Sequence, residues 1–186
     1  MSITLRKMTP DDAGAVTAFL SSNRFPFHMN AAPTEAEASR RVAAGHFWGG
    51  ESHGFWVQHD DDDIGLVVLE DLADDNPVFD LRLAEEHRGR GLGVDVVRAL
   101  CALAFTEFPE IVRFEGQTRE DNLAMRKTFL RAGFVKEAHY RQAWPTADGS
   151  RVASVAYAIL RSDWEQNTVT PLEFDDLFLD HESFQG

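Results

Sequence analysis

The stretch that decides the fold is "EEHRGRGLGVDVV", residues 85–97. Its central residues, 88–93, contain three glycines and two arginines, and an apolar, helix-like segment follows them. An apolar run typical of a strand, "PVFDLRL" at 77–83, comes directly before it. The sequence therefore predicts a strand, a tight turn and a helix, with the turn at the helix end whose backbone N–H groups lack partners within the helix.

The turn itself predicts an anion site, and its two arginines favour a diphosphate. Glycine allows positive φ angles and lets the backbone come close to a ligand, so successive N–H groups form a nest at the positive end of the helix dipole. Arg88 and Arg90 add full positive charges. The spacing differs from that of a P-loop, which needs a lysine and a hydroxyl, and from G-x-G-x-x-G. The alternative is a glycine turn flanked by surface arginines.

Composition limits the class of protein. The chain has 186 residues and a net charge of −13, which suits one globular domain and disfavours a nucleic-acid partner. No apolar run is long enough for a membrane span, and the first residues do not resemble a secretory signal. The single cysteine, Cys101, fits a reducing cytoplasm, and its spacing from apolar neighbours predicts a core residue. The scattered histidines lack metal-site spacing, so no metal is expected.

The remaining hydrophobic patterns predict a mixed sheet with helices on its faces. Strands follow both other strands and helices, which a fully parallel doubly wound sheet would not produce. Thr9 followed by Pro10 marks one helix start, and Thr34 with Glu37 forms a capping box for another. We expect strands at 3–8, 54–59, 64–70, 77–83, 112–118, 134–144 and 151–160, and helices at 10–22, 34–45, 92–108 and 122–133.

Two motifs together resemble those of the GNAT (Gcn-five-related) N-acetyltransferase superfamily. "RGRGLG" at 88–93 is similar to R/Q-x-x-G-x-G/A, the acyl-CoA pyrophosphate loop of that superfamily. Asn122, Met125, Phe129 and the pair 133–134 resemble its second signature, N-x-x-A/S-x-x-x-Y/F-x-x-x-G-F, with Met125 in place of the usual small residue.

The resemblance covers about residues 2–165, and the last hairpin, 141–164, is most similar to the RimJ/RimL-type branch. It implies an α/β (α+β) GNAT fold: a mixed, mostly antiparallel seven-stranded sheet, with helices on both faces and a splay between strands 4 and 5. Residues 1–165 would form the acyl-CoA N-acyltransferase domain. The acidic and aromatic extension, 166–186, would pack on this body or on a partner subunit.

The implied activity is transfer of an acetyl group from acetyl-CoA to a primary amine by direct attack in a ternary complex. The amine would belong to a small molecule, an amino acid or a peptide N-terminus, and the enzyme would be cytoplasmic, metal-free and possibly a homodimer, with neither a membrane nor nucleic acid as partner. Two other functions stay open: a catalytically silent acyl-CoA-binding regulatory protein, and a nucleotide phosphate binder that uses the same turn.

The resemblance also implies which residues contact acetyl-CoA. The backbone of the fourth strand would bind the pantetheine amides, the turn would bind the diphosphate, and one face of the Asn122 helix would line the ligand. The expected contacts are Leu81, Leu83, Glu85, Arg88, Gly89, Arg90, Gly91, Leu92, Gly93, Asn122, Met125 and Phe129.

For catalysis, a base is useful because a free lysine amine costs roughly 4.6 kcal/mol to deprotonate at pH 7, whereas an α-amine costs about 1 kcal/mol. Asp80 on the fourth strand is the first candidate base, with Glu70, Glu115 and His28 as alternatives. The catalytic set is Asp80, Glu70 and Asn122. Phe129 stands where many members carry a tyrosine acid, and water can protonate the thiolate instead.

The acceptor amine is expected beside the loop that joins the first two helices. That loop contains "RFPFHM", and aromatic side chains near acids suit a cationic or aromatic amine. The expected acceptor contacts are Phe25, Phe27, His28 and Trp56. Plain core packing is the alternative for the same side chains.

Overall fold

The computed structural model describes residues 2–146 and 148–173 of the chain. The strands are β1 (Ile3–Lys7), β2 (His53–His59), β3 (Asp62–Glu70), β4 (Val78–Leu83), β5 (Arg113–Arg119), β6 (Val135–Pro145) and β7 (Arg151–Leu160). The helices are η1 (Pro10–Asp12), α1 (Ala13–Ser22), α2 (Glu35–Ala43), η2 (Glu85–His87), α3 (Gly93–Glu107), α4 (Leu123–Arg131) and α5 (Arg161–Gln166). All seven predicted strands and four predicted helices are present, and only the short η2 and α5 lack a counterpart in the prediction.

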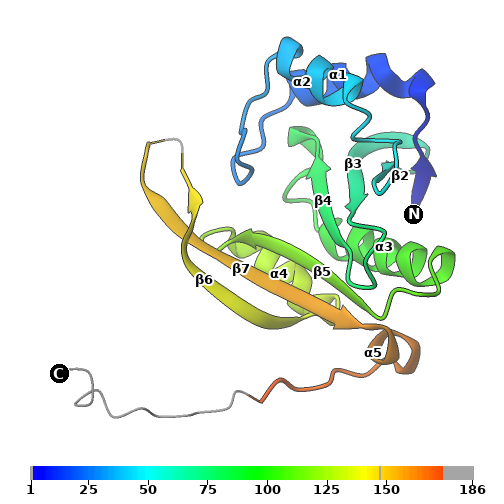
Figure 1. Cartoon of the computed structure of the whole chain (residues 1–186), viewed down its shortest axis with the longest axis vertical. Helices are drawn as coiled ribbons and strands as arrows, with labels where there is room; N and C mark the ends of the chain where they lie inside the picture. Colours follow the sequence, from blue (N-terminus) through cyan, green and yellow to red (C-terminus); the bar gives the residue numbers. More distant parts are fainter. Residues whose placement is uncertain (1, 147, 174–186) are drawn as a thin grey trace.

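The strands form one sheet in the order β1-β2-β3-β4-β5-β7-β6. Neighbouring strands are antiparallel except β4 and β5, which are parallel and share a single register pair, Val78 with Glu115. Beyond that pair the two strands separate, so the sheet divides into a β1–β4 half and a β5–β7 half (Figure 1). The predicted fold class, a mixed sheet splayed between strands 4 and 5, is confirmed.

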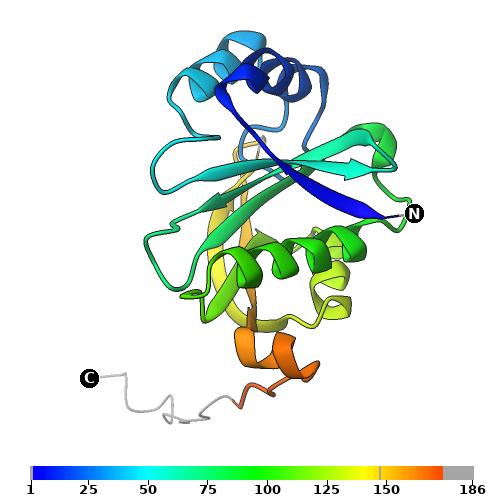
Figure 2. The same cartoon turned by 90° about the vertical axis from the view of Figure 1, so that its right-hand side faces the viewer.

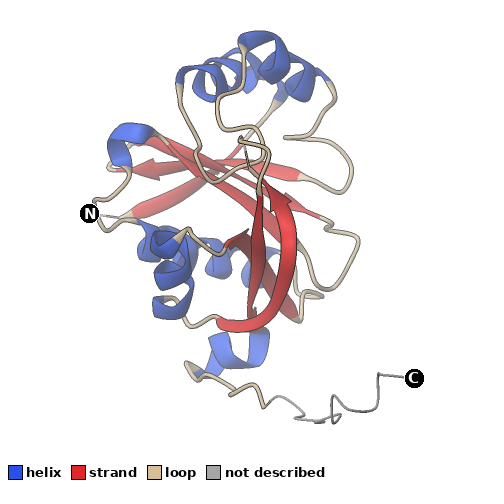
Figure 3. Ribbon diagram, turned by 90° about the vertical axis from the view of Figure 1, so that its left-hand side faces the viewer, coloured by secondary structure: helices blue, strands red, loops and turns tan. Residues whose placement is uncertain are grey.

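Helices cover both faces of the β1–β4 half-sheet (Figure 2). Helices α1 and α2 pack on one face through a core that includes Val16, Val42 and Trp56. Helix α3 packs on the other face, and this second core continues through α4 to the β5–β7 half (Figure 3). The gap between β4 and β5 therefore has α4 and the start of α3 on one side and the α1–α2 loop on the other.

Local sequence explains where several elements begin and end. The side chain of Thr34 accepts from the Glu37 N–H and the Glu37 carboxylate accepts from the Thr34 N–H, as a capping box requires. The β2–β3 hairpin turns on Asp60 and Asp61, both at positive φ (52° and 72°), which is the geometry of a two-residue type I′ turn. The acidic run is thus a hairpin tip, as the sequence predicts.

The second core is rich in aromatic rings around Phe129, which is 1% exposed and stacks on Tyr157 with ring centroids 5.1 Å apart. Gly116 on β5 makes room for this ring, because a Cβ at that position would lie 2.5 Å from Phe129 Cζ. Cys101 on α3 is buried in the same core, and burial raises the pKa of its thiol to about 12. It is a core residue, as predicted.

The described part of the C-terminal extension begins on the body of the protein. The buried carboxylate of Asp163 in α5 accepts hydrogen bonds from the Thr168 hydroxyl and from both the N–H and the hydroxyl of Thr170. Residues 174–186 lie outside the described ranges, so the expectation that the whole extension packs on the body or a partner stays a prediction. Within residues 2–146 and 148–173, no helix has the length and apolar character that a membrane span requires.

Candidate active site

A cavity of about 450 Å³ opens at the gap between β4 and β5. Four segments line it: the α1–α2 loop, β4, the glycine turn with the start of α3, and α4. Its lining contains Phe25, Pro26, Phe27, His28, Leu81, Arg82, Leu83, His87, Arg88, Gly89, Gly91, Leu92, Gly93, Val94, Asn122, Ala124, Met125, Lys127, Thr128 and Arg131. No carboxylate belongs to this lining in the part of the chain that the structure describes, whereas four lysine or arginine side chains do.

At one end of the cavity, the glycine turn leads into α3. Gly89 and Gly91 have φ values of 73° and 83°, and a Cβ at either position would meet open space rather than protein atoms. The positive φ therefore explains the glycines, since side chains avoid this conformation. The turn presents backbone N–H groups at the N-terminus of a 15-residue helix, where anions bind favourably.

Arg88 connects this turn to the α1–α2 loop. Its Nη2 donates to the carbonyl of Arg24, and its Nε is buried without a hydrogen-bond partner among the described residues. The carboxylate of Glu85 accepts from the Arg24 N–H (2.6 Å), and the Glu85 N–H donates to the side chain of Asn23 (3.0 Å). We call these three hydrogen bonds the loop anchor, because together they hold the loop against the β4–α3 connection.

Along β4, alternate backbone groups face the gap. The N–H of Ala84 donates to the Ile64 carbonyl on β3 (2.9 Å), and alternation along a strand directs the N–H groups of Arg82 and Asp80 to the same side. The N–H groups of Leu81 and Leu83 consequently point toward β5, where β4 no longer has a register partner. They are exposed donors on the edge of the gap.

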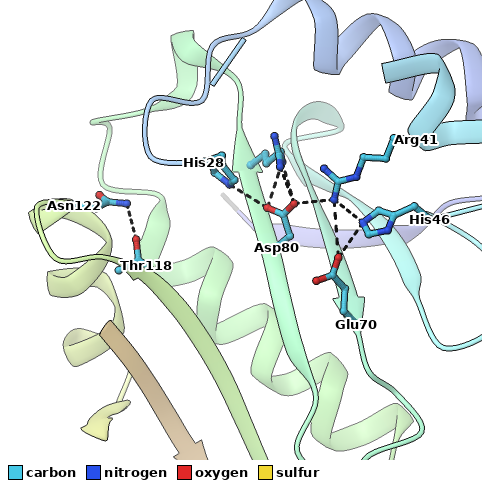
Figure 4. Close-up of polar contacts among 8 residues, drawn as sticks. His28, Arg41, His46, Glu70, Asp80, Thr118 and Asn122 are labelled. Atoms are coloured by element: carbon cyan, nitrogen blue, oxygen red, sulfur yellow. Dashed lines mark hydrogen bonds and ion pairs between the residues drawn. The ribbon is translucent and has the colours of Figure 1, made fainter. Parts of the chain in front are cut away.

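At the other end of the cavity, His28 and Asp80 form a hydrogen-bonded pair (Figure 4). His28 Nε2 lies 3.0 Å from Asp80 Oδ1, and Arg82 donates to the same carboxylate through Nε and Nη2 (3.1 and 2.9 Å to Oδ2). Burial alone would raise the pKa of Asp80, but the His28 hydrogen bond and the charges of Arg82, His28 and Arg41 outweigh it and hold this pKa well below its usual value. Asp80 is therefore a fixed anion.

A second acid continues this network away from the cavity. Arg41 on α2 donates to Asp80 Oδ2 (3.0 Å) and lies 3.9 Å from Glu70 Oε1, and His46 Nε2 lies 2.9 Å from the same Glu70 oxygen (Figure 4). Each carboxylate thus faces at least one arginine and one histidine. The cluster of His28, Arg41, His46, Glu70, Asp80 and Arg82, hereafter the polar cluster, joins residues from five separate segments.

This arrangement can bind an anion at one end and hold a histidine ring in a fixed orientation at the other, with a strand edge of free N–H groups between them. A model of the acetyltransferase (GNAT) domain matches residues 2–135. The chain belongs to the GNAT acetyltransferase family. It is therefore an acyl-CoA-dependent N-acyltransferase, and acetyl-CoA is the acyl donor.

Solved GNAT structures share the fold over most of the chain. Spermidine N-acetyltransferase from Vibrio cholerae, in complex with CoA and spermine, is 19% identical with a TM-score of 0.75, over 88% of this chain and 98% of that one. AAC(6′)-Ib in complex with ribostamycin and coenzyme A is 22% identical with a TM-score of 0.69, over 92% and 100%. A GNAT-family acetyltransferase from Bacillus anthracis is 16% identical with a TM-score of 0.71, over 87% and 96%. No curated protein matches the chain, and the RimJ/RimL-type branch stays a prediction.

The structure brings most of the predicted GNAT site residues to one cavity. Those in its lining are Phe25, Phe27, His28, Leu81, Leu83, Arg88, Gly89, Gly91, Leu92, Gly93, Asn122 and Met125. Asn122 also has a structural role, because its side chain accepts from the Met125 N–H at the start of α4 (3.2 Å) and donates to Thr118 (3.0 Å; Figure 4). Both polar atoms of the amide are thus already bonded.

Several predicted contacts do not reach the cavity. Trp56 is 2% exposed in the α1–α2 core, with its indole N–H bonded to Asp12, so it packs instead of lining the acceptor site. Phe129 faces the aromatic core one turn beyond Met125. Arg90 is exposed at the tip of the turn.

Three carboxylates offered for the site are likewise outside its lining. Glu85 is used in the loop anchor, Glu70 lies behind Asp80 in the polar cluster, and Glu115 pairs with Arg113 (2.6 Å). Asp80 itself is not in the lining either, but it contacts His28 and Arg82, which are.

The sequence prediction missed cationic residues in the lining: His87 before the turn, Arg82 on β4, and Arg131 on α4. Arg131 lies four residues after Lys127, and this spacing places both on one helix face, so helical periodicity was a usable signal. Arg82 shows period-two alternation with Asp80, which places the two side chains on the same face of β4. Arg126 instead turns inward and donates to the Tyr157 hydroxyl (3.2 Å). Among the described residues, no group of three or more potential ligands could hold a metal ion.

Proposed function

We propose that this enzyme transfers an acetyl group from acetyl-CoA directly to the primary amine of a small molecule, with His28 as the base and Asp80 as the residue that orients it. The observation that carries the proposal is the His28–Asp80 pair at one end of a cavity whose other end is the glycine turn. The named enzymes with this fold act on polyamine or aminoglycoside amines, which supports a small amine acceptor.

The residues present fit the donor. The diphosphate would lie on the backbone N–H groups of residues 89–93, beside Arg88, whose buried Nε has no protein partner in the described chain. Lys127 and Arg131 on α4 would face the remaining phosphate charge. The absence of carboxylates from the described lining removes the repulsion that such a polyanion would otherwise meet.

The strand edge would hold the thioester arm. The N–H groups of Leu81 and Leu83 face the gap without a register partner on β5, so they are free to donate to amide carbonyls of pantetheine or to the thioester carbonyl. Fixed donors aimed at an oxygen where negative charge develops lower the barrier to acyl transfer.

His28 would take the proton of the attacking amine. Asp80 is a fixed anion and keeps the proton of a neutral imidazole on Nε2, so the lone pair stays on Nδ1. The amine nitrogen forms a bond to the thioester carbon, its proton moves to Nδ1, and the carbon–sulfur bond breaks to release a thiolate. Asp80 is better suited to this orienting role than to the role of base that the sequence favours, because a carboxylate with a depressed pKa binds protons weakly.

The experiment is a thiol-release assay with acetyl-CoA and a panel of primary amines, on the wild type, His28→Ala and His139→Ala. We expect His28→Ala to lower kcat about 10²- to 10⁴-fold at pH 7 with little change in the KM for acetyl-CoA. His139 on β6 lies outside the cavity lining, so its replacement should leave kcat unchanged. Wild-type protein that releases no thiol with any amine would overturn the proposal. Action on peptide N-termini, homodimer formation and a cytoplasmic location stay predictions.

A further inference from the structure

Two buried polar atoms at the reacting end of the cavity have no hydrogen-bond partner within the described ranges: His28 Nδ1 and Arg82 Nη1. Both belong to residues that line the cavity and that bind opposite sides of the Asp80 carboxylate. An unpaired buried donor or acceptor is costly and uncommon in a folded protein. Such a pair therefore points to a ligand that supplies the missing partners.

The Arg82 side chain is held rigidly in this position. It is 7% exposed, its Nε and Nη2 are fixed by Asp80, and its guanidinium lies over the Phe25 ring, 4.9 Å from the ring centre. Nη1 is the one nitrogen of the guanidinium that remains available. Because both of its hydrogens are donors, it can be satisfied only by an acceptor atom, such as a carbonyl or carboxylate oxygen.

The surroundings disfavour a second ammonium group. None of the described lining residues is an aspartate or glutamate, and Asp80 and Glu70 already face arginine and histidine partners. An amine chain with several positive charges would meet Arg82 and His28 without a free carboxylate to bind it. The two unpaired atoms instead form one acceptor, on His28, beside one donor, on Arg82.

We infer that the acceptor substrate carries a carbonyl or carboxylate oxygen next to its amine, as an α-amino acid or an α-amino amide does, and that Arg82 is the residue that selects it. The amine hydrogen is directed to His28 Nδ1 while the neighbouring oxygen accepts from Arg82 Nη1. This inference rests on the proposed function, since it assigns the acceptor of the same site. It separates this enzyme from the polyamine acetyltransferases that share its fold.

The test compares two acceptors that differ only in that oxygen-bearing group: phenylalaninamide, and phenethylamine, which lacks the carboxamide. Spermidine is the third acceptor. Rates are expressed per free amine, which removes the difference in amine pKa. We expect the wild type to use phenylalaninamide with a kcat/KM at least about tenfold above that of phenethylamine or spermidine, because a hydrogen bond from a charged donor is lost with the latter two. Equal or reversed preference overturns the inference and leaves the proposed function standing.

Arg82→Lys then assigns the residue. Lysine keeps the positive charge beside Asp80 but removes Nη1, so we expect the preference for phenylalaninamide to fall at least about tenfold while kcat/KM for phenethylamine stays nearly constant. Arg113→Lys is the matched control, because Arg113 binds carboxylates on the next strand and lies outside the cavity lining. An unchanged preference in Arg82→Lys, or an equal loss for every acceptor with a raised KM for acetyl-CoA, overturns the role given to Arg82.

If Arg82→Lys does not fold, as thermal unfolding would reveal, the wild-type comparison still decides the acceptor class. Transfer to none of the three amines, or to any other primary amine, would instead overturn the proposed function itself.

Discussion

The two ends of the cavity are built in opposite ways. The diphosphate end is a single short segment, residues 88–93, whose positive-φ glycines and helix N-terminus follow from local sequence. The reacting end is the polar cluster, in which His28 and Asp80 are 52 residues apart and Arg41 and Asp80 are 39 apart. Binding of the donor thus relies on backbone geometry, while handling of the amine relies on side chains that only the completed fold brings together.

This difference teaches where variation is tolerated. A backbone nest requires glycine and little else, so its pattern survives in sequence. A side-chain cluster can be assembled from many combinations of residues and segments, so its chemistry can change while the fold stays the same. Each prediction below perturbs one end and asks whether the other responds.

The largest effect is expected from charge reversal at the diphosphate end. Arg88→Glu removes a charge-assisted donor and adds a negative charge beside the phosphates, so we expect the KM for acetyl-CoA to rise about 10- to 100-fold. Arg90→Glu makes the same change two residues away at the exposed tip of the turn, and its effect should be much smaller. Steady-state kinetics with varied acetyl-CoA measure both. Equal effects would mean that the turn acts through general charge and not through the cavity-lining arginine.

A smaller effect is expected from the backbone of the same turn. Gly91→Ala places a side chain at a φ of 83°, which costs about 1–2 kcal/mol of unfolding free energy and weakens acetyl-CoA binding. Gly14→Ala is the matched control in α1, where φ is not positive and no atom lies within 4 Å of the new Cβ, so stability should rise by about 0.4–1 kcal/mol. Urea denaturation and calorimetric titration with acetyl-CoA measure the two quantities. A stable Gly91→Ala protein with unchanged affinity would contradict the nest.

The smallest effect concerns pH and the reacting end. The pKa of Asp80 is depressed in the folded state, so its contribution to stability is complete above the unfolded pKa, about 3.9, and is lost as the pH falls through the folded value. We therefore expect the wild type to lose stability more steeply than Asp80→Asn below about pH 5.

The comparison uses urea midpoints from pH 7 to pH 3. Other carboxylates with lowered pKa values, such as Asp12 and Asp163, titrate in both proteins and cancel in the difference. Parallel curves would show that Asp80 titrates at its ordinary value and is not the fixed anion described above.

Sequence reasoning recovered the fold because each element has its own local signal. The capping box at Thr34, the proline at the start of the first helix and the glycine after α4 place helix ends without reference to the rest of the chain. Helix α5 was missed because it is a short helix, residues 161–166, that directly continues the last strand. The two-residue turn at Asp60 and Asp61 was placed correctly by its position between two apolar runs.

The candidate site was recovered unevenly for the same reason. The turn and the strand edge were readable, but Trp56 and Phe129 were assigned to the site although both are buried in cores. An aromatic residue on a strand or helix gives no sign of whether its ring faces a cavity or a neighbouring ring. Asp80 was found by its strand position, whereas its depressed pKa depends on Arg41 and His28, which only the tertiary structure brings to it.

The loop anchor has a consequence for how the enzyme responds to its two substrates. The guanidinium of Arg88 is bonded to the main chain immediately before Phe25, so a phosphate that draws this side chain toward itself also competes for a hydrogen bond that positions the aromatic loop. Occupancy of the nucleotide half of the cavity and the position of the amine-facing loop are thereby thermodynamically linked, and linkage is reciprocal. Affinity for one substrate is then a property measured only at a stated concentration of the other.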